Sequence, residues 1–89
     1  MRGEMEEILK EELRVLALKT RDRMQLTQNR MAEVLAMSEN SYSDIETGTY
    51  MCGTLTTVLL LMEQEKPETF LTELHGKFQK LYVEEFRRI

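Results

Sequence analysis

Hydrophobic residues recur at steps of three and four along most of the chain, which is the spacing of one face of an α-helix. The first such stripe extends from Met5 to Met24, and the last extends from Phe70 through Tyr82 toward Phe86 and Ile89. No stretch alternates apolar and polar residues over the length of a strand with turn glycines at hairpin spacing. The pattern therefore predicts an all-α fold.

Two short helices are predicted in the first half of the chain, beginning at Thr27 and at Ser38. Each hydroxyl can accept a hydrogen bond from a backbone N–H that the helix leaves unpaired. The residue before each cap and the fourth residue after it are apolar, as in a hydrophobic staple: Leu26 with Met31, and Met37 with Tyr42. Only Ala36 and Met37 separate the two helices. We therefore expect them to cross rather than to continue in one line.

The second short helix should end near Thr47, because Gly48 can adopt the left-handed conformation that closes a helix. Segment 54–62 has β-branched residues that also suit a strand, but we predict a helix there, capped by Thr54, because its neighbours are helical. Its buried face is expected to consist of Leu55, Val58, Leu59 and Met62. A last helix is predicted at about 67–88, with Pro67 at its first position. Residues 1–89 then form a single domain of five helices.

The composition is typical of a small globular protein. The chain has 89 residues, of which 42% are hydrophobic and 31% are charged, as in one globular domain. Its longest apolar run, Val58 to Met62, is far shorter than the roughly 20 residues of a membrane span. The acidic start does not resemble a secretory signal, so we expect a cytoplasmic protein. Because the single Cys52 and single His75 form no metal-binding or catalytic pattern, we expect no enzyme, metal or cofactor.

The charges are unevenly distributed along the sequence. Residues 1–30 and residues 66–89 each carry a net charge of +1, whereas residues 31–65 contain six acidic residues and no Lys or Arg. The whole net charge of −4 therefore arises in the middle third of the chain.

Residues 27–48 resemble the helix-turn-helix of Cro and phage-repressor-type DNA-binding domains, the XRE-like transcriptional regulators. The positions in register with the family pattern are Leu26-Thr27-Gln28, Ala32, Ala36, Met37-Ser38, Tyr42, Ile45-Glu46 and Gly48. The resemblance covers about residues 13–63. It implies a five-helix, repressor-like fold and a non-catalytic, sequence-specific regulator of transcription that binds double-stranded DNA.

The resemblance also assigns roles to individual residues. Gln28 would contact a phosphate, and Arg21 would pair with Glu46 to brace the reading helix, although the pair could equally be an ordinary surface ion pair. Arg23 and Arg30 are candidate phosphate contacts, with plain solvation as the alternative. The side of the reading helix that would face the major groove comprises Ser38, Glu39, Asn40, Ser43 and Asp44.

Three of these side chains are candidate base readers. The Asn40 amide suits an adenine edge, and the Glu39 or Asp44 carboxylate can accept from a cytosine amine. Each acid also has a simpler interpretation, because Glu39 is favoured at a helix N-terminus and Asp44 can be merely solvated.

Departures from the family pattern weaken the DNA-binding hypothesis, and the missing cations favour a second one. The turn position usually occupied by glycine is Ala36, and the reading helix carries acids where relatives often carry Arg or Lys. Phosphate neutralisation supplies most non-specific DNA affinity. The alternative function is a helix-turn-helix scaffold for protein–protein contact, antirepressor or antitoxin-like, with weak or no DNA binding.

The run from Leu59 to Met62 is apolar around most of a helix, so one face of it needs a further cover. We expect a two-fold homodimer built from the fourth and fifth helices. Its predicted interface residues are Leu60, Leu61, Phe78, Leu81 and Tyr82. The alternative is that the last helix folds back and covers this run within one chain.

Overall fold

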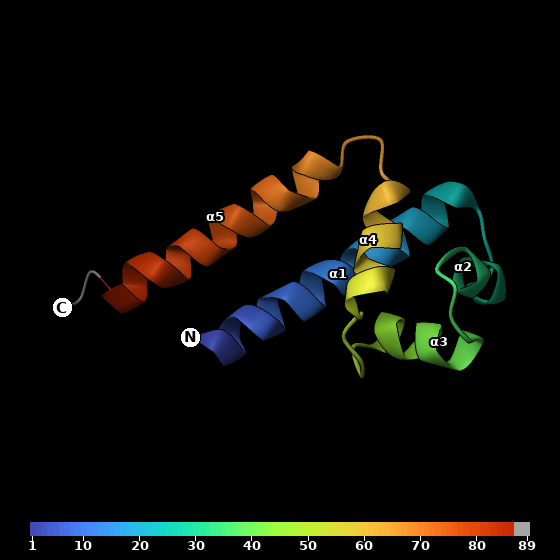
Figure 1. Ribbon diagram of the computed structural model, residues 1–89, viewed down its shortest axis with the longest axis horizontal. Coiled ribbons are helices and arrows are strands. Elements are labelled where there is room, and N and C mark those ends of the chain that lie inside the picture. The colour runs from blue at the N-terminus through green and yellow to red at the C-terminus, as the bar shows by residue number, and fades with distance from the viewer. Residues whose placement is uncertain (87–89) are drawn as a thin grey trace.

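The computed structural model describes residues 1–86, with side chains for residues 1–84 (Figure 1). Within this range the chain is all-helical, as predicted from the sequence. The helices are α1 (Arg2–Met24), α2 (Gln28–Val34), α3 (Glu39–Thr47), α4 (Thr54–Met62) and α5 (Pro67–Phe86). The predicted continuation of the last helix to residue 88, and the side chains of Phe86 and Ile89, lie outside the described residues.

The long helix α1 is the support on which the others are arranged (Figure 1). The short helices α2 and α3 contact each other, and α3 also packs against α1. Helix α4 crosses α1, and α5 then runs back along α1 in the opposite direction. The N-terminus and the end of α5 therefore lie at the same end of the molecule, away from α2 and α3.

The core lies where α1, α2 and α3 meet, and α4 and α5 contribute one buried side chain each. Its buried hydrophobic members are Leu13, Ala17, Met31, Ala32, Leu35, Tyr42, Ile45, Cys52, Leu60 and Phe70. Ala17 and Ala32 are small, which lets the helices approach closely at those positions. Cys52, in the loop between α3 and α4, is 8% exposed and belongs to this core.

The N-caps predicted for the two short helices, α2 and α3, are confirmed. The Thr27 hydroxyl accepts a hydrogen bond from the Arg30 N–H at 3.2 Å, and the Ser38 hydroxyl accepts one from the Ser41 N–H at 3.2 Å. Each bond satisfies a donor that the first turn of the helix cannot pair internally. The starts of α2 and α3 are thus fixed by local sequence.

Helices α1, α2 and α3 all end in the same backbone motif, with a left-handed residue just beyond the helix. This residue is Gln25 at φ 57°, Ala36 at φ 56° and Gly48 at φ 80°. In each case the N–H of this residue and the N–H of the residue after it bond back to the last turn, for example Ala36 to the Glu33 carbonyl and Met37 to the Ala32 carbonyl. Only the glycine adopts this conformation without a steric cost.

Helix α4 turns a different side to the core than predicted, although Leu59 of the predicted face does pack against the core. Leu60 is fully buried, whereas Leu55, Val58 and Met62, which were expected to be buried, are 65%, 46% and 72% exposed. The cap was also predicted wrongly, because Gly53 and not Thr54 is the N-cap residue. Six of the nine positions of α4 are apolar and they are spread around the helix, so the sequence pattern did not determine its orientation.

Contacts with α1 fix the orientation of α4. The Gln64 amide donates to the hydroxyl of buried Thr20 at 2.8 Å and to the Leu60 carbonyl at 2.9 Å. Arg23 donates to the Glu63 carbonyl at 2.7 Å. These bonds join the last turns of α1 to the end of α4 and turn the Leu60 side inward.

Helix α5 begins at Pro67, as predicted, and is anchored to the core by buried Phe70. Farther along, Lys77 forms an ion pair with Glu12 of α1. Leu61, Phe78 and Leu81, predicted at a dimer interface, are half-buried within the chain, and Tyr82 is exposed. The assignment of Leu60 to that interface is wrong, because this side chain is in the core.

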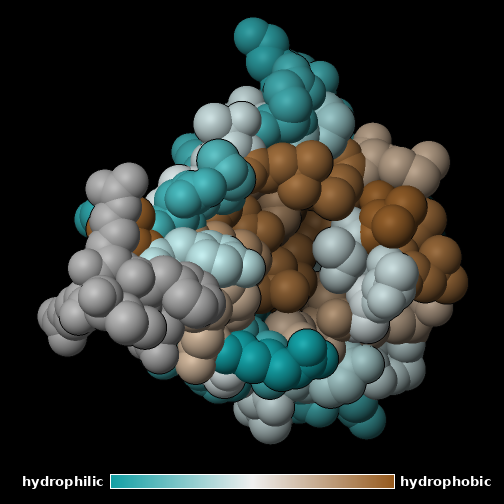
Figure 2. All heavy atoms as spheres, turned by 60° about the vertical axis from the view of Figure 1, so that its left-hand side comes forward, coloured by the Kyte–Doolittle hydropathy of each residue, from teal (hydrophilic) through white to brown (hydrophobic). Residues whose placement is uncertain are grey.

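The folded chain leaves apolar surface uncovered. Figure 2 shows hydrophobic side chains gathered around a hollow on one face, with hydrophilic side chains at its rim. Among the described residues the large hydrophobic side chains that are exposed are Tyr50, Leu55, Val58, Met62, Leu71, Tyr82 and Val83. None of the helices in residues 1–86 has both the length and the apolar character needed to cross a membrane.

Candidate nucleic-acid interface

The carboxylate of Glu46 joins the three helices that build the candidate interface. Arg21 of α1 donates to it through Nε at 2.6 Å and through Nη2 at 3.2 Å. Gln28, at the start of α2, donates its amide to the same carboxylate at 2.9 Å. The third Arg21 nitrogen, Nη1, reaches the Leu26 carbonyl at 3.2 Å. One side chain of α3 is thereby tied to α1, to α2 and to the turn between them.

This network is largely withdrawn from solvent. The Glu46 side chain is 6% exposed and that of Arg21 is 29% exposed. Burial raises the pKa of the Glu46 carboxyl, but hydrogen bonds from Arg21, Tyr42 and Gln28 outweigh it and leave the pKa below its usual value. Burial, together with the neighbouring Glu46 carboxylate, raises the pKa of fully buried Tyr42. Glu46 is therefore ionised and Tyr42 neutral near pH 7, and the Tyr42 hydroxyl donates to the Ala17 carbonyl at 3.5 Å.

The geometry changes the interpretation of Gln28. Its amide was expected to contact a phosphate, but it is half-buried and occupied by Glu46. Arg21 and Glu46, expected to pair, are in bidentate contact, which is the strong geometry for an Arg–carboxylate pair. The participation of Gln28 in the same network was not expected from the sequence, because Gln28 and Glu46 are 18 positions apart and such a separation carries no periodic signal of contact.

The outward side of α3 carries the candidate base readers. Glu39, Asn40 and Asp44 are exposed and Ser43 is half-buried. Asn40 and Asp44 are one helical turn apart and therefore lie on the same face. No hydrogen bond or ion pair within the described part of the chain occupies either side chain. These two groups are free to bond an external partner.

Two other residues of the predicted groove-facing side, Glu39 and Ser38, already have partners within the chain. The Glu39 carboxylate accepts from the Asn29 amide of α2 at 3.1 Å, a link between helices that the sequence did not indicate. The Ser38 hydroxyl is the cap of α3 and also bonds the Ser41 hydroxyl at 2.9 Å. An external ligand would have to compete for both groups.

The two candidate phosphate contacts, Arg23 and Arg30, are also bonded to other groups within the chain. Arg23 holds the carbonyl of Glu63, and Arg30 is paired with Glu33 at 2.9 Å. Both guanidinium groups are on exposed residues, so exchanging these partners for phosphates requires little desolvation. The surface of α2 and α3 also presents the carboxylates of Glu33, Glu39 and Asp44, and this part of the sequence contains no Lys or Arg after Arg30. The surface is thus better suited to forming hydrogen bonds with a partner than to neutralising phosphate charges.

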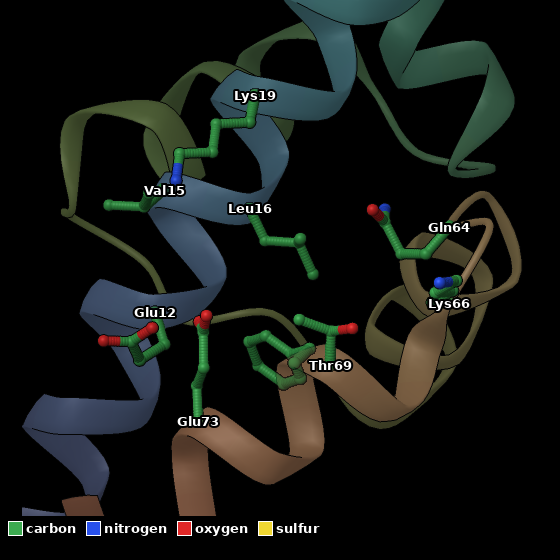
Figure 3. A pocket seen from close by; sticks show the side chains of 9 residues that line it. Glu12, Val15, Leu16, Lys19, Gln64, Lys66, Thr69 and Glu73 are labelled. Carbon is green, nitrogen blue, oxygen red and sulfur yellow. The ribbon is translucent and has the colours of Figure 1, made fainter.

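A separate cavity of about 190 Å³ lies between α1, the α4–α5 connection and the first turns of α5 (Figure 3). Leu16 points into it from α1, and Thr69 and Glu73 reach toward it from α5. Small-molecule pockets usually measure about 300–1,000 Å³, so this hollow is too small for most cofactors. Among the described residues, no group of His, Cys, Asp and Glu side chains is arranged to hold a metal ion.

Comparison of the chain with protein-family models, with curated proteins and with solved structures finds no match in any of the three. Functional inference therefore depends on the residues and their geometry.

Proposed function

We propose that this protein is a non-catalytic, sequence-specific DNA-binding regulator of transcription, of the repressor-like helix-turn-helix type. The observation that supports the proposal most directly is the Glu46 network: Arg21 and Gln28 hold α3 by its inner side while Asn40 and Asp44 remain unoccupied on its outer side. An α-helix presented in this way has the size of a DNA major groove.

In this mechanism α3 enters the major groove and discriminates between base pairs. The Asn40 amide can donate to and accept from one adenine edge at the same time, and the Asp44 carboxylate can accept from a cytosine amine. Phosphate contacts come from Arg23 and Arg30 after they release their partners within the chain. Regulation follows from occupation of an operator, which excludes or recruits other proteins there.

Selection from a library of randomised DNA duplexes tests this function. The wild-type protein is expected to enrich one short motif at about 50 mM salt. Asn40→Ala should remove the preference at one position of the motif, at a cost of about 1–3 kcal/mol in binding free energy, because one bidentate base contact is lost.

Gln79→Ala is the matched control, since it also removes an exposed side-chain amide but lies on α5. This variant should enrich the same motif as the wild type. Both variants should retain the wild-type circular dichroism spectrum. An Asn40→Ala protein that selects the unchanged motif would contradict the assignment of α3 as the reading element.

The acidic surface favours a second candidate, a scaffold of the same architecture that contacts another protein. The exposed carboxylates of Glu33, Glu39 and Asp44 repel the phosphate backbone and suit a basic partner surface. This candidate predicts that no duplex is retained even at low salt. That result, with a correctly folded protein, would replace the first proposal by the second.

A further inference from the structure

The cavity between α1 and the start of α5 has an apolar floor that belongs to the protein core (Figure 3). Leu16 of α1 points into the cavity and packs against the core. Phe70 of α5 also lines the cavity and is 7% exposed. Because close-packed neighbours hold both side chains in place, a ligand in the cavity would rest on a fixed apolar surface.

Three charged side chains around this floor have no bonded partner. Lys19 comes from α1, Lys66 from the α4–α5 connection and Glu73 from α5, and all three are on exposed residues. Within residues 1–84, no hydrogen bond or ion pair occupies any of these side chains, and none joins either ammonium group to the Glu73 carboxylate. The cavity thus offers charges of both signs that do not satisfy each other.

The fourth charge that lines the cavity is already balanced. The Glu12 carboxylate forms an ion pair with Lys77. Lys77 is also near enough to Glu73 to interact with it electrostatically, but its ammonium group is bonded to Glu12. Two positive groups and one negative group therefore remain available to a ligand.

Two neutral groups add hydrogen-bonding capacity to the cavity. The Gln64 amide nitrogen donates to the Thr20 hydroxyl and to the Leu60 carbonyl, which uses both of its hydrogens and fixes the amide in one orientation. Its oxygen accepts no hydrogen bond from the described residues. The Thr69 hydroxyl, which can donate and accept, reaches toward the cavity from α5.

Together these groups determine which kind of ligand the cavity suits. A simple anion would leave the Glu73 carboxylate without a partner beside it, and a simple amine would do the same to Lys19 and Lys66. A molecule with both an ammonium and a carboxylate group can pair with both kinds of side chain. We propose that the cavity binds a free α-amino acid with a small aliphatic side chain. Its carboxylate faces the two lysines, its ammonium group faces Glu73, and its aliphatic group covers Leu16 and Phe70.

The volume of the cavity limits the size of this amino acid. An engineered cavity of about 150 Å³ accommodates benzene. The volume here is about 190 Å³, which by the same ratio suits an amino acid of the size of valine. The aromatic amino acids are too large for this space, whereas glycine would leave the apolar floor exposed to water.

The cavity is separate from the proposed reading surface. None of its lining residues belongs to α3 or to the group formed by Arg21, Gln28 and Glu46. Absence of DNA binding would therefore leave the amino-acid site untouched, and the reverse also holds. Because the charged groups of the cavity are exposed, each contributes modestly to affinity, and we expect a dissociation constant on the order of 1 mM.

Titration of the isotopically labelled full chain with valine, followed by NMR, tests the proposal. Valine up to about 20 mM should produce saturable shifts in the amide signals of residues 15–19 and 64–70, while the signals of α3 stay unchanged. Two analogues test the need for both charges: 3-methylbutanoate lacks the ammonium group, and isobutylamine lacks the carboxylate. Each should bind about fivefold more weakly than valine, because one charged contact is lost.

Glu73→Gln should also weaken valine binding about fivefold, since it removes the charge and keeps the shape of the side chain. Glu84→Gln is the matched control, because it neutralises an exposed carboxylate of α5 outside the cavity, and it should bind valine as the wild type does. If Glu73→Gln fails to fold, Lys66→Gln in the α4–α5 connection takes its place with the same expected loss.

Three results would overturn the proposal. The first is a wild type whose signals show no saturable shift with valine. The second is an analogue with a single charge that binds as tightly as valine. The third is a folded Glu73→Gln protein that binds valine no more weakly than Glu84→Gln does.

Discussion

At the scale of single residues, Glu46 is the most consequential side chain of the molecule. Its carboxylate accepts from Arg21 and Gln28 and is 6% exposed. A buried carboxylate with several donors is stable only while it is ionised and all its donors are in place. The orientation of α3 therefore depends on one charged group, whatever α3 binds.

The ionisation of Glu46 predicts a specific pH dependence. Burial raises its pKa, and hydrogen bonds from Arg21, Tyr42 and Gln28 lower it further than burial raises it, so the folded-state pKa lies below 4.5. The stability from this group is thus fully present above about pH 4.5 and is lost as the pH falls through the folded-state pKa. We expect Glu46→Gln to destabilise the fold by about 2 kcal/mol at pH 7.

The difference in unfolding free energy between the wild type and Glu46→Gln should then shrink as the pH is lowered below 4.5. Urea denaturation followed by circular dichroism at several pH values measures it. A difference that stays constant down to about pH 3 would contradict the ionised network.

Ala36 is a second residue with a clear expectation. Its φ of 56° is left-handed, a conformation that costs a residue with a Cβ roughly 1 kcal/mol relative to glycine. Ala36→Gly should therefore raise the unfolding free energy by up to about 1 kcal/mol, less the larger chain entropy of glycine in the unfolded state. Ala36→Val should lower it, because β-branching is least tolerated at positive φ. Thermal denaturation of the wild type and of both variants measures whether the two substitutions change the unfolding free energy in opposite directions.

At the scale of elements, α2 and α3 form a unit whose ends are fixed locally. Side-chain caps at Thr27 and Ser38 begin the helices, and left-handed residues at Ala36 and Gly48 end them. Seven- and nine-residue helices are too short to be stable alone, so their packing on α1 must supply the rest of the stability.

The cap of α3 can be tested with two serines of the same helix region. Ser38→Ala should lower the unfolding free energy by about 1 kcal/mol, because the Ser41 N–H loses its acceptor. Ser43→Ala is the matched control, since this residue lies inside α3 and caps nothing, and its effect should be within about 0.5 kcal/mol. Equal losses for the two variants in chemical denaturation would show that the cap bond is not what stabilises the start of α3.

At the scale of the whole molecule, the positive charges are separated from the proposed reading surface on α3. The cations near α2 and α3 are Lys19, Arg21, Arg23 and Arg30, and Arg21 is held by Glu46. The surface itself is acidic. If the protein binds DNA as proposed, its affinity must come more from base contacts and less from phosphates than is usual for a DNA-binding domain.

This distribution predicts a shallow salt dependence. With two or three phosphate contacts per protomer, the logarithm of the association constant should fall with the logarithm of salt concentration at a slope of about −2 to −3. Arg30→Gln should reduce the slope by about one per protomer. Lys80→Gln, which removes an exposed cation of α5, should leave it unchanged. Fluorescence anisotropy with the selected duplex measures the slopes, and a wild-type slope near −8 would contradict the few-contact interface.

The sequence by itself determined the all-helical fold, the starts of α2, α3 and α5, and the left-handed end at Gly48. These features depend on periodicity and on residues within one helical turn of each other, which is the range over which local sequence acts. The pairing of Arg21 with Glu46 was expected only through the family resemblance.

Tertiary structure alone decided which side of α4 faces the core and which polar side chains remain free. Because α4 is apolar on every side, its orientation follows from bonds made by Arg23 and Gln64 and not from its own pattern. Likewise, Gln28 was expected to contact a phosphate and Glu39 a base, yet Glu46 and Asn29 occupy them in the folded chain. Burial and competition for hydrogen bonds depend on residues distant in sequence, so they are settled only when the helices pack.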